Sequence, residues 1–253
     1  MQIQGVSAIV TGGASGMGAE TARHLAKNGA KVTVLDVNED AVLKVAHEIG
    51  GLGFVCDVTD SASAERAFEQ ARAAHGPARI AVNCAGIAPA ARIVGRDGPM
   101  PLEAFRKVIE VNLIGTFNIL RLAAADMAKL DLLDSGERGV IVNTASVAAY
   151  EGQIGQAAYA SSKGGIVALT ICAARDLARS AIRVMTIAPG LIGTPMLLNM
   201  PQEVQDSLAA TVPFPKRFGR PDEYARLVQH IVENEMLNGD VIRLDGAIRM
   251  APQ

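Results

Sequence analysis

The segment SAIVTGGASGMGAETARHLAKN, residues 7–28, decides the fold. It opens with an apolar run of strand length over residues 7–11 and passes through a glycine-rich turn. Helical apolar spacing then follows over residues 16–28. A strand that enters a helix through so short a turn is typical of the first half of a right-handed βαβ unit. The segment therefore predicts a parallel sheet whose first strand begins near residue 7.

The same alternation of strand and helix patterns continues along the rest of the chain. We expect strands at residues 7–11, 31–36, 53–55, 80–83, 140–144, 183–188 and 241–244. Helices are expected at residues 16–28, 39–49, 61–75, 102–130, 157–180, 202–209 and 221–233. The strands are continuous apolar runs, which indicates burial on both faces of a parallel sheet. The sequence therefore predicts an α/β fold of the Rossmann type, a doubly wound seven-stranded parallel sheet with helices on both faces.

Composition and charge narrow the functional classes. The chain has 253 residues, of which 49% are hydrophobic and 20% charged, and its formal net charge is −2. This balance gives no electrostatic reason to expect nucleic acid or a membrane as a partner. The three cysteines match no zinc or redox spacing, so we expect no metal site and a reducing compartment. Without a visible leader segment we expect a cytoplasmic protein, with the mitochondrial matrix as the alternative in a eukaryote.

The glycine turn is the first candidate binding site. Gly12, Gly16 and Gly18 allow backbone to approach a pyrophosphate, and the following helix N-terminus supplies free N–H groups. A glycine-rich turn without a ligand is the alternative. Asp36 at the end of the second strand favours a dinucleotide, because its carboxylate can accept hydrogen bonds from ribose hydroxyls. It would also repel a 2′-phosphate, and positions 37 and 38 carry no Lys or Arg, so we predict NAD.

Two further strand ends fall at the same predicted edge of the sheet. Asp57 and Val58 follow the third strand and can flank an adenine. The motif NCAG, residues 83–86, ends the fourth strand with small residues that let a nucleotide pass. For Asn83 the alternative role is bonding to neighbouring backbone. In open α/β sheets, ligands lie at the carboxyl ends of the strands.

Four polar residues form a candidate catalytic set: Asn112, Ser146, Tyr159 and Lys163. Each has an ordinary structural alternative, such as a helix kink for Asn112, a turn for Ser146 and a solvated helix face for the Tyr–Lys pair. Together they suit alcohol oxidation and carbonyl reduction, which need a base and a proton donor. A phenol has a pKa of about 10, and a nearby ammonium lowers it. Ser146 can polarise the substrate oxygen, Lys163 can hold ribose hydroxyls, and Asn112 can anchor a water that leads to Lys163.

These motifs resemble the short-chain dehydrogenase/reductase superfamily. The segments TGGASGMG, NCAG and APGLIGTP and the four polar residues match its pattern in order and spacing over essentially the whole chain. The resemblance implies one domain over residues 1–253, with a nucleotide-binding half to about residue 140 and a catalytic and substrate-binding half from about 141. The cofactor-binding residues that it implies are Gly12, Ser15, Gly16, Met17, Gly18, Asp36, Asp57, Val58, Cys84, Ala85, Gly86, Tyr159, Lys163, Pro189, Gly190, Ile192 and Thr194.

Longer segments, among them RGVIVNTASVAAYEGQIGQAAYASSKGGIV and NGDVIRLDGAIRM, resemble the 3-hydroxyacyl-CoA dehydrogenases of this superfamily. The resemblance implies oxidation of the 3-hydroxyl of acyl-CoA thioesters with NAD, with steroids and simple alcohols as further substrates, and a homotetramer. It assigns Tyr159 as general base, Ser146 as ligand of the substrate oxygen and Lys163 as the group that tunes Tyr159. The substrate-binding residues that we expect are Ser146, Gln153, Gln156, Tyr159, Met196 and Leu197.

The substrate itself stays open at this stage. Residues 191–220 hold a short apolar helix between prolines, which we interpret as a lid over an acyl tail or a flat steroid skeleton. Arg92 and Arg96 can meet CoA phosphates, or they can be solvated loop charges beside Asp97. A hydroxysteroid or other hydrophobic-alcohol dehydrogenase is therefore the alternative function. A non-catalytic NAD-binding scaffold is the distant one, since a scaffold has no chemical need for Tyr and Lys together.

Overall fold

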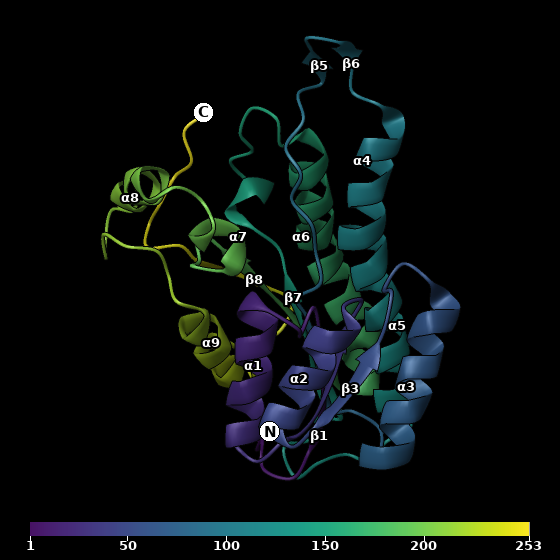
Figure 1. Ribbon diagram of the computed structural model, residues 1–253. Coiled ribbons are helices and arrows are strands. Elements are labelled where there is room, and N and C mark those ends of the chain that lie inside the picture. Colours follow the sequence, from purple (N-terminus) through teal and green to yellow (C-terminus); the bar gives the residue numbers. More distant parts are fainter. Residues whose placement is uncertain (253) are drawn as a thin grey trace.

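A computed structural model describes residues 1–252, with the side chain of Met196 left out. Its centre is a seven-stranded parallel sheet in the order β3-β2-β1-β4-β7-β8-β9 (Figure 1). The strands are β1 Ser7–Thr11, β2 Lys31–Asp36, β3 Leu52–Val55, β4 Ile80–Asn83, β7 Gly139–Thr144, β8 Ile182–Pro189 and β9 Val241–Leu244. The predicted α/β doubly wound fold is confirmed, and the predicted strand bounds differ from these by one residue at most.

The strand order reverses at β1, and this reversal places the site. β1 pairs with β2 on one side and with β4 on the other, so Thr11 lies opposite both Leu35 and Asn83. The chain turns away from the sheet in opposite directions after β1 and β4, because the helices that follow them cover opposite faces. A crevice opens between the two turns, which is where ligands bind in sheets of this topology.

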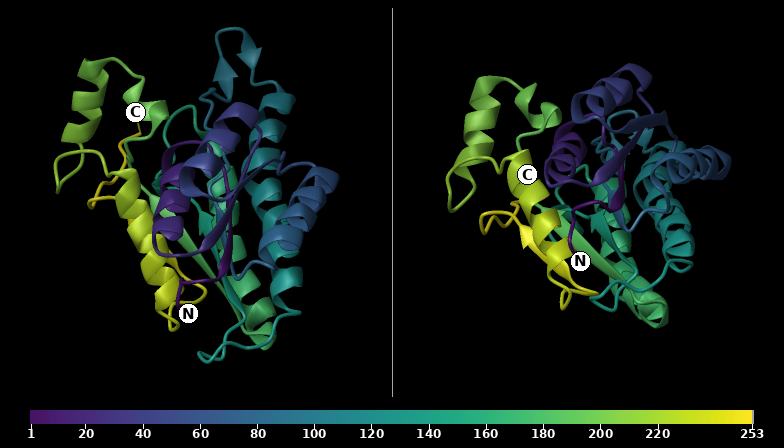
Figure 2. Two further views of the ribbon diagram at one scale, coloured as in Figure 1. Left: turned by 60° about the horizontal axis from the view of Figure 1, so that its bottom comes forward. Right: turned by 90° about the horizontal axis from the view of Figure 1, so that it is seen from below.

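Helices cover both faces of the sheet (Figures 1 and 2). One layer consists of α1 Gly16–Lys27, α2 Glu39–Ile49 and α9 Pro221–Glu233, and the other of α3 Ser61–His75, α4 Leu102–Ile109, α5 Gly115–Met127 and α6 Ala157–Leu177. Alternate residues of each strand supply the two cores. Val82 and Val142 pack with Leu25 on the α1 side, whereas Ala81 and Ile141 pack on the α5 side. Burial of both strand faces explains the continuous apolar runs in the sequence.

The helix predicted over residues 102–130 is interrupted. A π-helical turn, Glu110–Ile114, separates α4 from α5, and the second helix ends at Met127. The wider turn carries Asn112, whose side chain is fully buried. Gly115 follows directly, and a Cβ there would lie 2.5 Å from Val58 Cγ2. The apolar spacing of residues 102–130 predicted one continuous helix and gave no sign of this π-helical turn.

Several short elements lie outside the sheet. The predicted lid contains two helices, α7 Pro195–Leu198 and α8 Gln202–Ala210, near the carboxyl edge of the sheet (Figure 1). The sequence did not predict the hairpin of β5 Val94–Gly95 and β6 Gly98–Pro99, which projects beyond α4. Backbone pairs between Gly219 and residues 191–193 fasten the base of the lid, since Gly193 N donates to Gly219 O and Gly219 N to Leu191 O.

Two helical stretches are long and apolar enough to cross a membrane by length and composition alone. They are Leu102–Met127 and Ala157–Ser180, with 50% and 39% of the relevant windows buried in the structure. Both serve as sheet-covering helices here: α5 packs on β4 and β7, and α6 packs on β8. Their apolar character is therefore explained in part by the core, and the exposed remainder includes Ile114, Phe117 and Ile171.

Candidate active site

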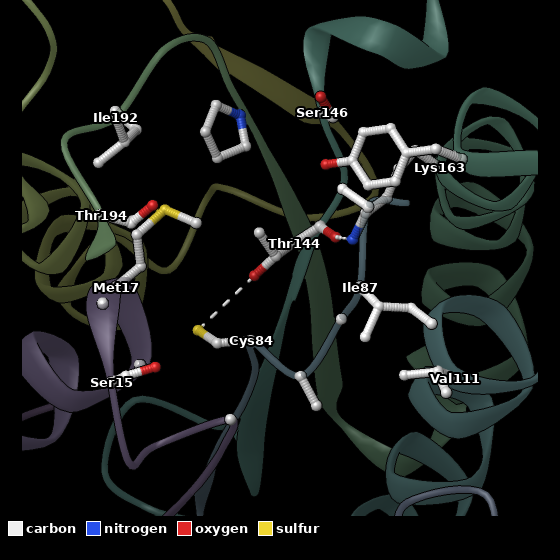
Figure 3. Close-up of a pocket in the computed structure, with 18 of the residues that line it drawn as sticks. Ser15, Met17, Cys84, Ile87, Val111, Thr144, Ser146, Lys163, Ile192 and Thr194 are labelled. Atoms are coloured by element: carbon white, nitrogen blue, oxygen red, sulfur yellow. Dashed lines mark hydrogen bonds between the residues drawn. The ribbon is translucent and has the colours of Figure 1, made fainter. Parts of the chain in front are cut away.

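One cavity of about 590 Å³ lies along the carboxyl ends of the strands. Every residue that the sequence analysis assigns to cofactor binding lines it, from Gly12 to Thr194, together with Ser146. Figure 3 shows Ser15 and Met17 of the glycine turn on one side of the cavity, and Ser146 and Lys163 on the other. The two halves of the predicted site are far apart in the chain, and the structure places them on opposite sides of one cavity.

The glycine turn is built from backbone in close contact. A Cβ on Gly12 would lie 2.7 Å from Ala85 N, and one on Gly18 would lie 2.2 Å from Gly12 O. Gly12 and Gly16 also have φ angles of 61° and 53°, which favour glycine. No side chain fits at these contacts, so the N-terminus of α1 opens directly onto the cavity. This cradle suits a pyrophosphate.

Asp36 lines the cavity next to the glycine turn. Its Oδ2 accepts a hydrogen bond from Ala14 N at 3.1 Å, and its Oδ1 accepts one from Asn38 N at 3.1 Å. These bonds fix the carboxylate between the glycine turn and the start of α2, at the rim of the cavity. The next side chain, Val37, is 66% exposed and carries no charge. The fixed carboxylate fits a pair of ribose hydroxyls and opposes an added phosphate.

Asp57 and Val58 line the cavity beyond Asp36. The hydroxyl and backbone N–H of Thr59 both donate to Asp57 Oδ1, and these bonds lower the pKa of the Asp57 carboxyl. Val58 is held by its carbonyl oxygen, which accepts a hydrogen bond from Asn118 Nδ2 at 2.8 Å. These hydrogen bonds hold in place the turn that carries Asp57 and Val58, the two residues that we expect to flank the adenine.

Lys163 is buried deep in the wall of the cavity. Its Nζ donates to the carbonyl oxygen of Thr144 at 2.8 Å and lies 5.7 Å from the centre of the Tyr159 ring. Burial lowers the pKa of the Lys163 ammonium to about 8. The hydrogen bond ties α6 to the end of β7, so the helix that carries Tyr159 is fixed relative to the sheet.

Tyr159 differs from the expectation in one respect. The sequence analysis predicted that Lys163 would lower the pKa of the phenol. In the structure, burial raises the pKa of Tyr159, and a hydrogen bond with Ser146 only partly opposes that shift. The ammonium of Lys163 points to Thr144 O instead. Removing the phenol from water disfavours its charged form more strongly than these neighbours stabilise it.

Ser146 lies at the junction of β7 and a short 3₁₀ turn, Val147–Ala149. Its Oγ accepts a hydrogen bond from Ala148 N at 3.1 Å, which fixes the side-chain rotamer. The hydroxyl hydrogen points toward Tyr159, where a substrate oxygen can also accept it. Ser146 therefore lies in a turn, as the alternative to a catalytic role suggested, and it also lines the cavity.

Asn112 lies behind the cavity wall and makes three side-chain hydrogen bonds. Its Oδ1 accepts from Ile87 N at 2.8 Å, and its Nδ2 donates to Ile87 O at 2.9 Å and to Ser162 Oγ at 2.9 Å. The amide therefore joins the π-helical turn to α6 and to the segment after β4. Both Nδ2 hydrogens are used in these bonds, so a water anchored by the side-chain amide would donate to the second lone pair of Oδ1.

The predicted substrate residues are divided. Gln156 and Leu197 line the cavity, whereas Gln153 lies outside it and donates from Nε2 to Ala251 O at 3.0 Å. The side chain of Met196 lies outside the described residues. Met250 lines the cavity as well. Sequence reasoning did not single it out, because it sits after the last strand in a segment without periodicity.

A buried polar network behind Lys163 also escaped prediction. The Tyr224 hydroxyl lies 2.7 Å from Thr144 Oγ1, and Cys84 Sγ lies 3.6 Å from the Tyr224 hydroxyl (Figure 3 shows Cys84 and Thr144). Burial raises the pKa of the Cys84 thiol and keeps it neutral. In the sequence, Tyr224 looks like an ordinary core residue of an amphipathic helix, so only tertiary structure could place its hydroxyl.

The low pKa of Lys163 predicts a pH-dependent cost in stability. In the unfolded chain the ammonium titrates near 10.5 and in the folded protein near 8. Burial of the charged form should therefore cost about 3 kcal/mol below pH 8. That cost should vanish as the pH rises from 8 to 10.5, because the folded state loses its proton first. Lys163→Met should thus unfold at higher urea concentration than wild type at pH 7, with a gap that closes by about pH 10.5.

Lys129→Met is the matched control, because Lys129 is exposed at the end of the α5 segment. Its difference from wild type should be the same at both pH values. A Lys163→Met variant that is less stable than wild type at pH 7 would contradict the prediction.

Comparisons with known proteins agree with this geometry. Residues 7–205 match the family model of the short chain dehydrogenases. The chain is 52% identical to the 3-hydroxyacyl-CoA dehydrogenase type-2 of Bos taurus, over 99% of this chain and 97% of that one. It is 48% identical to the protein of the same name from Drosophila melanogaster, over 99% of this chain and all of the other.

A solved structure gives the same result in three dimensions. The crystal structure of 3-hydroxyacyl-CoA dehydrogenase type-2 from Mycobacterium avium superposes with a TM-score of 0.94 at 45% identity, over 98% of each chain. Full-length similarity at this level includes the glycine turn, the sheet and the segment that carries Tyr159 and Lys163. The chain therefore belongs to the short-chain dehydrogenase family, whose members are oxidoreductases that use a nicotinamide cofactor.

Proposed function

We propose that this protein is an NAD-dependent dehydrogenase that interconverts 3-hydroxyacyl-CoA and 3-oxoacyl-CoA. The observation that carries the proposal is the single cavity lined by the glycine turn, Asp36, Ser146, Tyr159 and Lys163. That cavity unites a dinucleotide cradle with a proton-transfer group. Similarity of about half of all residues to enzymes named 3-hydroxyacyl-CoA dehydrogenase type-2 supports the substrate class.

The chain supplies the proton chemistry of the reaction. When bound, the nicotinamide ring accepts or donates the hydride. Ser146 Oγ orients the substrate oxygen, and Tyr159 Oη takes the proton from the hydroxyl in oxidation or returns it in reduction. Because burial raises the pKa of Tyr159, the neutral phenol dominates near pH 7 and is ready to act as the acid of ketone reduction. Oxidation should gain from higher pH, where the phenolate is more populated.

The first test is a substrate panel read by NADH absorbance. We expect turnover of 3-hydroxyacyl-CoA, and Tyr159→Phe should lose about 10²- to 10⁴-fold in kcat, the range typical of a lost general acid or base. The variant should retain NAD binding in calorimetry. Tyr150→Phe is the matched control, because the Tyr150 side chain is 49% exposed and lies outside the cavity. Turnover of hydroxysteroids without turnover of acyl-CoA would overturn the substrate and favour the hydrophobic-alcohol alternative.

The preference for NAD over NADP should depend on Asp36. Without its carboxylate, the repulsion of a 2′-phosphate disappears and so does an acceptor for the ribose hydroxyls. Asp36→Ala should therefore shift the ratio of kcat/KM for NADP over NAD by at least about tenfold in favour of NADP, which corresponds to about 1.4 kcal/mol. Asp40→Ala, an exposed acidic change in the first turn of α2, is the control and should leave the ratio unchanged. Wild-type protein that uses both cofactors equally well would refute the assignment.

We also propose that the protein assembles as a homotetramer through the outer faces of α5 and α6. Phe117 on α5 and Ile171 on α6 expose 48% and 39% of their surfaces, and Ile114, in the turn just before α5, exposes 49%. Apolar side chains on helices that already bury another face in the core favour an interface with a second copy. Light scattering at micromolar concentration should give four times the chain mass, and Phe117→Lys should lower it; a wild-type monomer would refute the proposal.

A further inference from the structure

Beyond β9 the chain turns back toward the active site. Gly246 and Ala247 have φ angles of 58° and 67°, which reverse its direction, and the buried side chain of Ile248 anchors the turn. Residues 249–252, called the strap below, then run beside the lid at the carboxyl edge of the sheet (Figure 1). Met250 is the strap residue that lines the cavity.

A carboxylate latch holds the strap in place. Glu151 Oε2 accepts a hydrogen bond from Met250 N at 3.0 Å. Arg243 on β9 donates to both oxygens of the same carboxylate, at 2.9 and 3.2 Å. The guanidinium of Arg249 lies 3.4 Å from Glu151 Oε1. Glu151 and Arg243 are only 19% and 23% exposed, so this bidentate pair is better shielded than an ordinary surface ion pair.

Two further bonds fasten the strap to the loop between Ser146 and Tyr159. Ile154 N donates to Pro252 O at 2.8 Å, and Gln153 Nε2 donates to Ala251 O at 3.0 Å. The same loop continues to Gln156, which lines the cavity at the start of α6. The strap therefore reaches the cavity from the side of the catalytic Ser–Tyr pair and not from the side of the glycine turn.

We propose that the strap is a fixed wall of the substrate pocket, in which Met250 contacts the apolar tail of the substrate and sets the preferred chain length. Glu151 is a positioning residue that acts by holding the Met250 backbone. The inference rests on the proposed function for the identity of the tail, an acyl chain. A flexible thioether suits this place, because it fills the end of an apolar pocket without imposing one ligand shape.

Shortening Met250 should lengthen the pocket. Burial of one methylene changes binding by about 0.8 kcal/mol, or about fourfold in kcat/KM for each added carbon that gains a contact. Met250→Ala should therefore raise the ratio of kcat/KM for ten-carbon over four-carbon 3-hydroxyacyl-CoA by about tenfold or more. Met250→Leu should stay close to wild type. Met236→Ala is the matched control, since Met236 is 92% exposed and lies outside the cavity.

The role of Glu151 is tested by coupling. Glu151→Ala should shift the chain-length profile in the same direction as Met250→Ala, and the double variant should shift it no further, because both changes remove one wall. The dissociation constant for NADH, measured by fluorescence, should stay within about twofold of wild type in all variants. Should Glu151→Ala fail to fold, the Met250 variants decide alone.

The outcomes separate the two proposals. An unchanged chain-length profile in an active Met250→Ala variant overturns the strap as a specificity wall, whatever the natural substrate is. If wild-type protein turns over no acyl-CoA, the proposed function fails, and the same variants are then compared on straight-chain secondary alcohols of increasing length. A shift of preference toward longer alcohols in Met250→Ala, and not in the control Met236→Ala, would support the wall, and an unchanged profile would again refute it.

Discussion

The site depends on a contact that leaves no room for a side chain. At the turn between β1 and α1, Gly18 packs on the backbone of Gly12, which in turn packs on Ala85 at the end of β4. These contacts bring the N-terminus of α1 into the crevice where the strand order reverses. The helix dipole and its free N–H groups are useful there only because the backbone itself forms the wall. The remaining site residues are arranged around that opening, at the ends of other strands and on α6.

The catalytic half is organised by burial and not by attraction between charges. Lys163 is desolvated, its ammonium is held by a backbone carbonyl, and the phenol beside it is kept neutral. Such an arrangement stabilises the fold less than an apolar core would. It brings the pKa of Lys163 down to about 8, and it raises the pKa of Tyr159, so that the phenol keeps its proton near pH 7. The network of Thr144, Tyr224 and Cys84 behind Lys163 keeps this wall rigid without adding a charge.

The sequence was sufficient for the features that follow from local pattern. The glycine turn, the strand ends and the Tyr–Lys spacing predicted the sheet and the residues that line the cofactor side of the cavity. It was insufficient where distant segments decide the geometry. Gln153 was assigned to the substrate but bonds Ala251, and Met250 was passed over, because nothing local indicates that the segment after β9 folds back. The pKa of Tyr159 was assigned the wrong direction, since spacing reveals a neighbouring charge but not desolvation.

The π-helical turn at Glu110–Ile114 has a consequence for how the gene can change in length. Each residue of an α-helix advances the chain by about 100° around its axis, so losing one residue here would rotate α5 by about that angle relative to α4. Such a rotation would carry Asn112 away from Ile87 and Ser162, and it would turn Phe117 from the outer surface toward a different neighbour. The hairpin of β5 and β6 lies outside the main sheet and can change in length, whereas the π-helical turn cannot gain or lose a residue without this rotation. The inner face of α5, which packs on the sheet, and its outer face lie on one rigid helix. A single-residue insertion or deletion in this turn would therefore move both faces together.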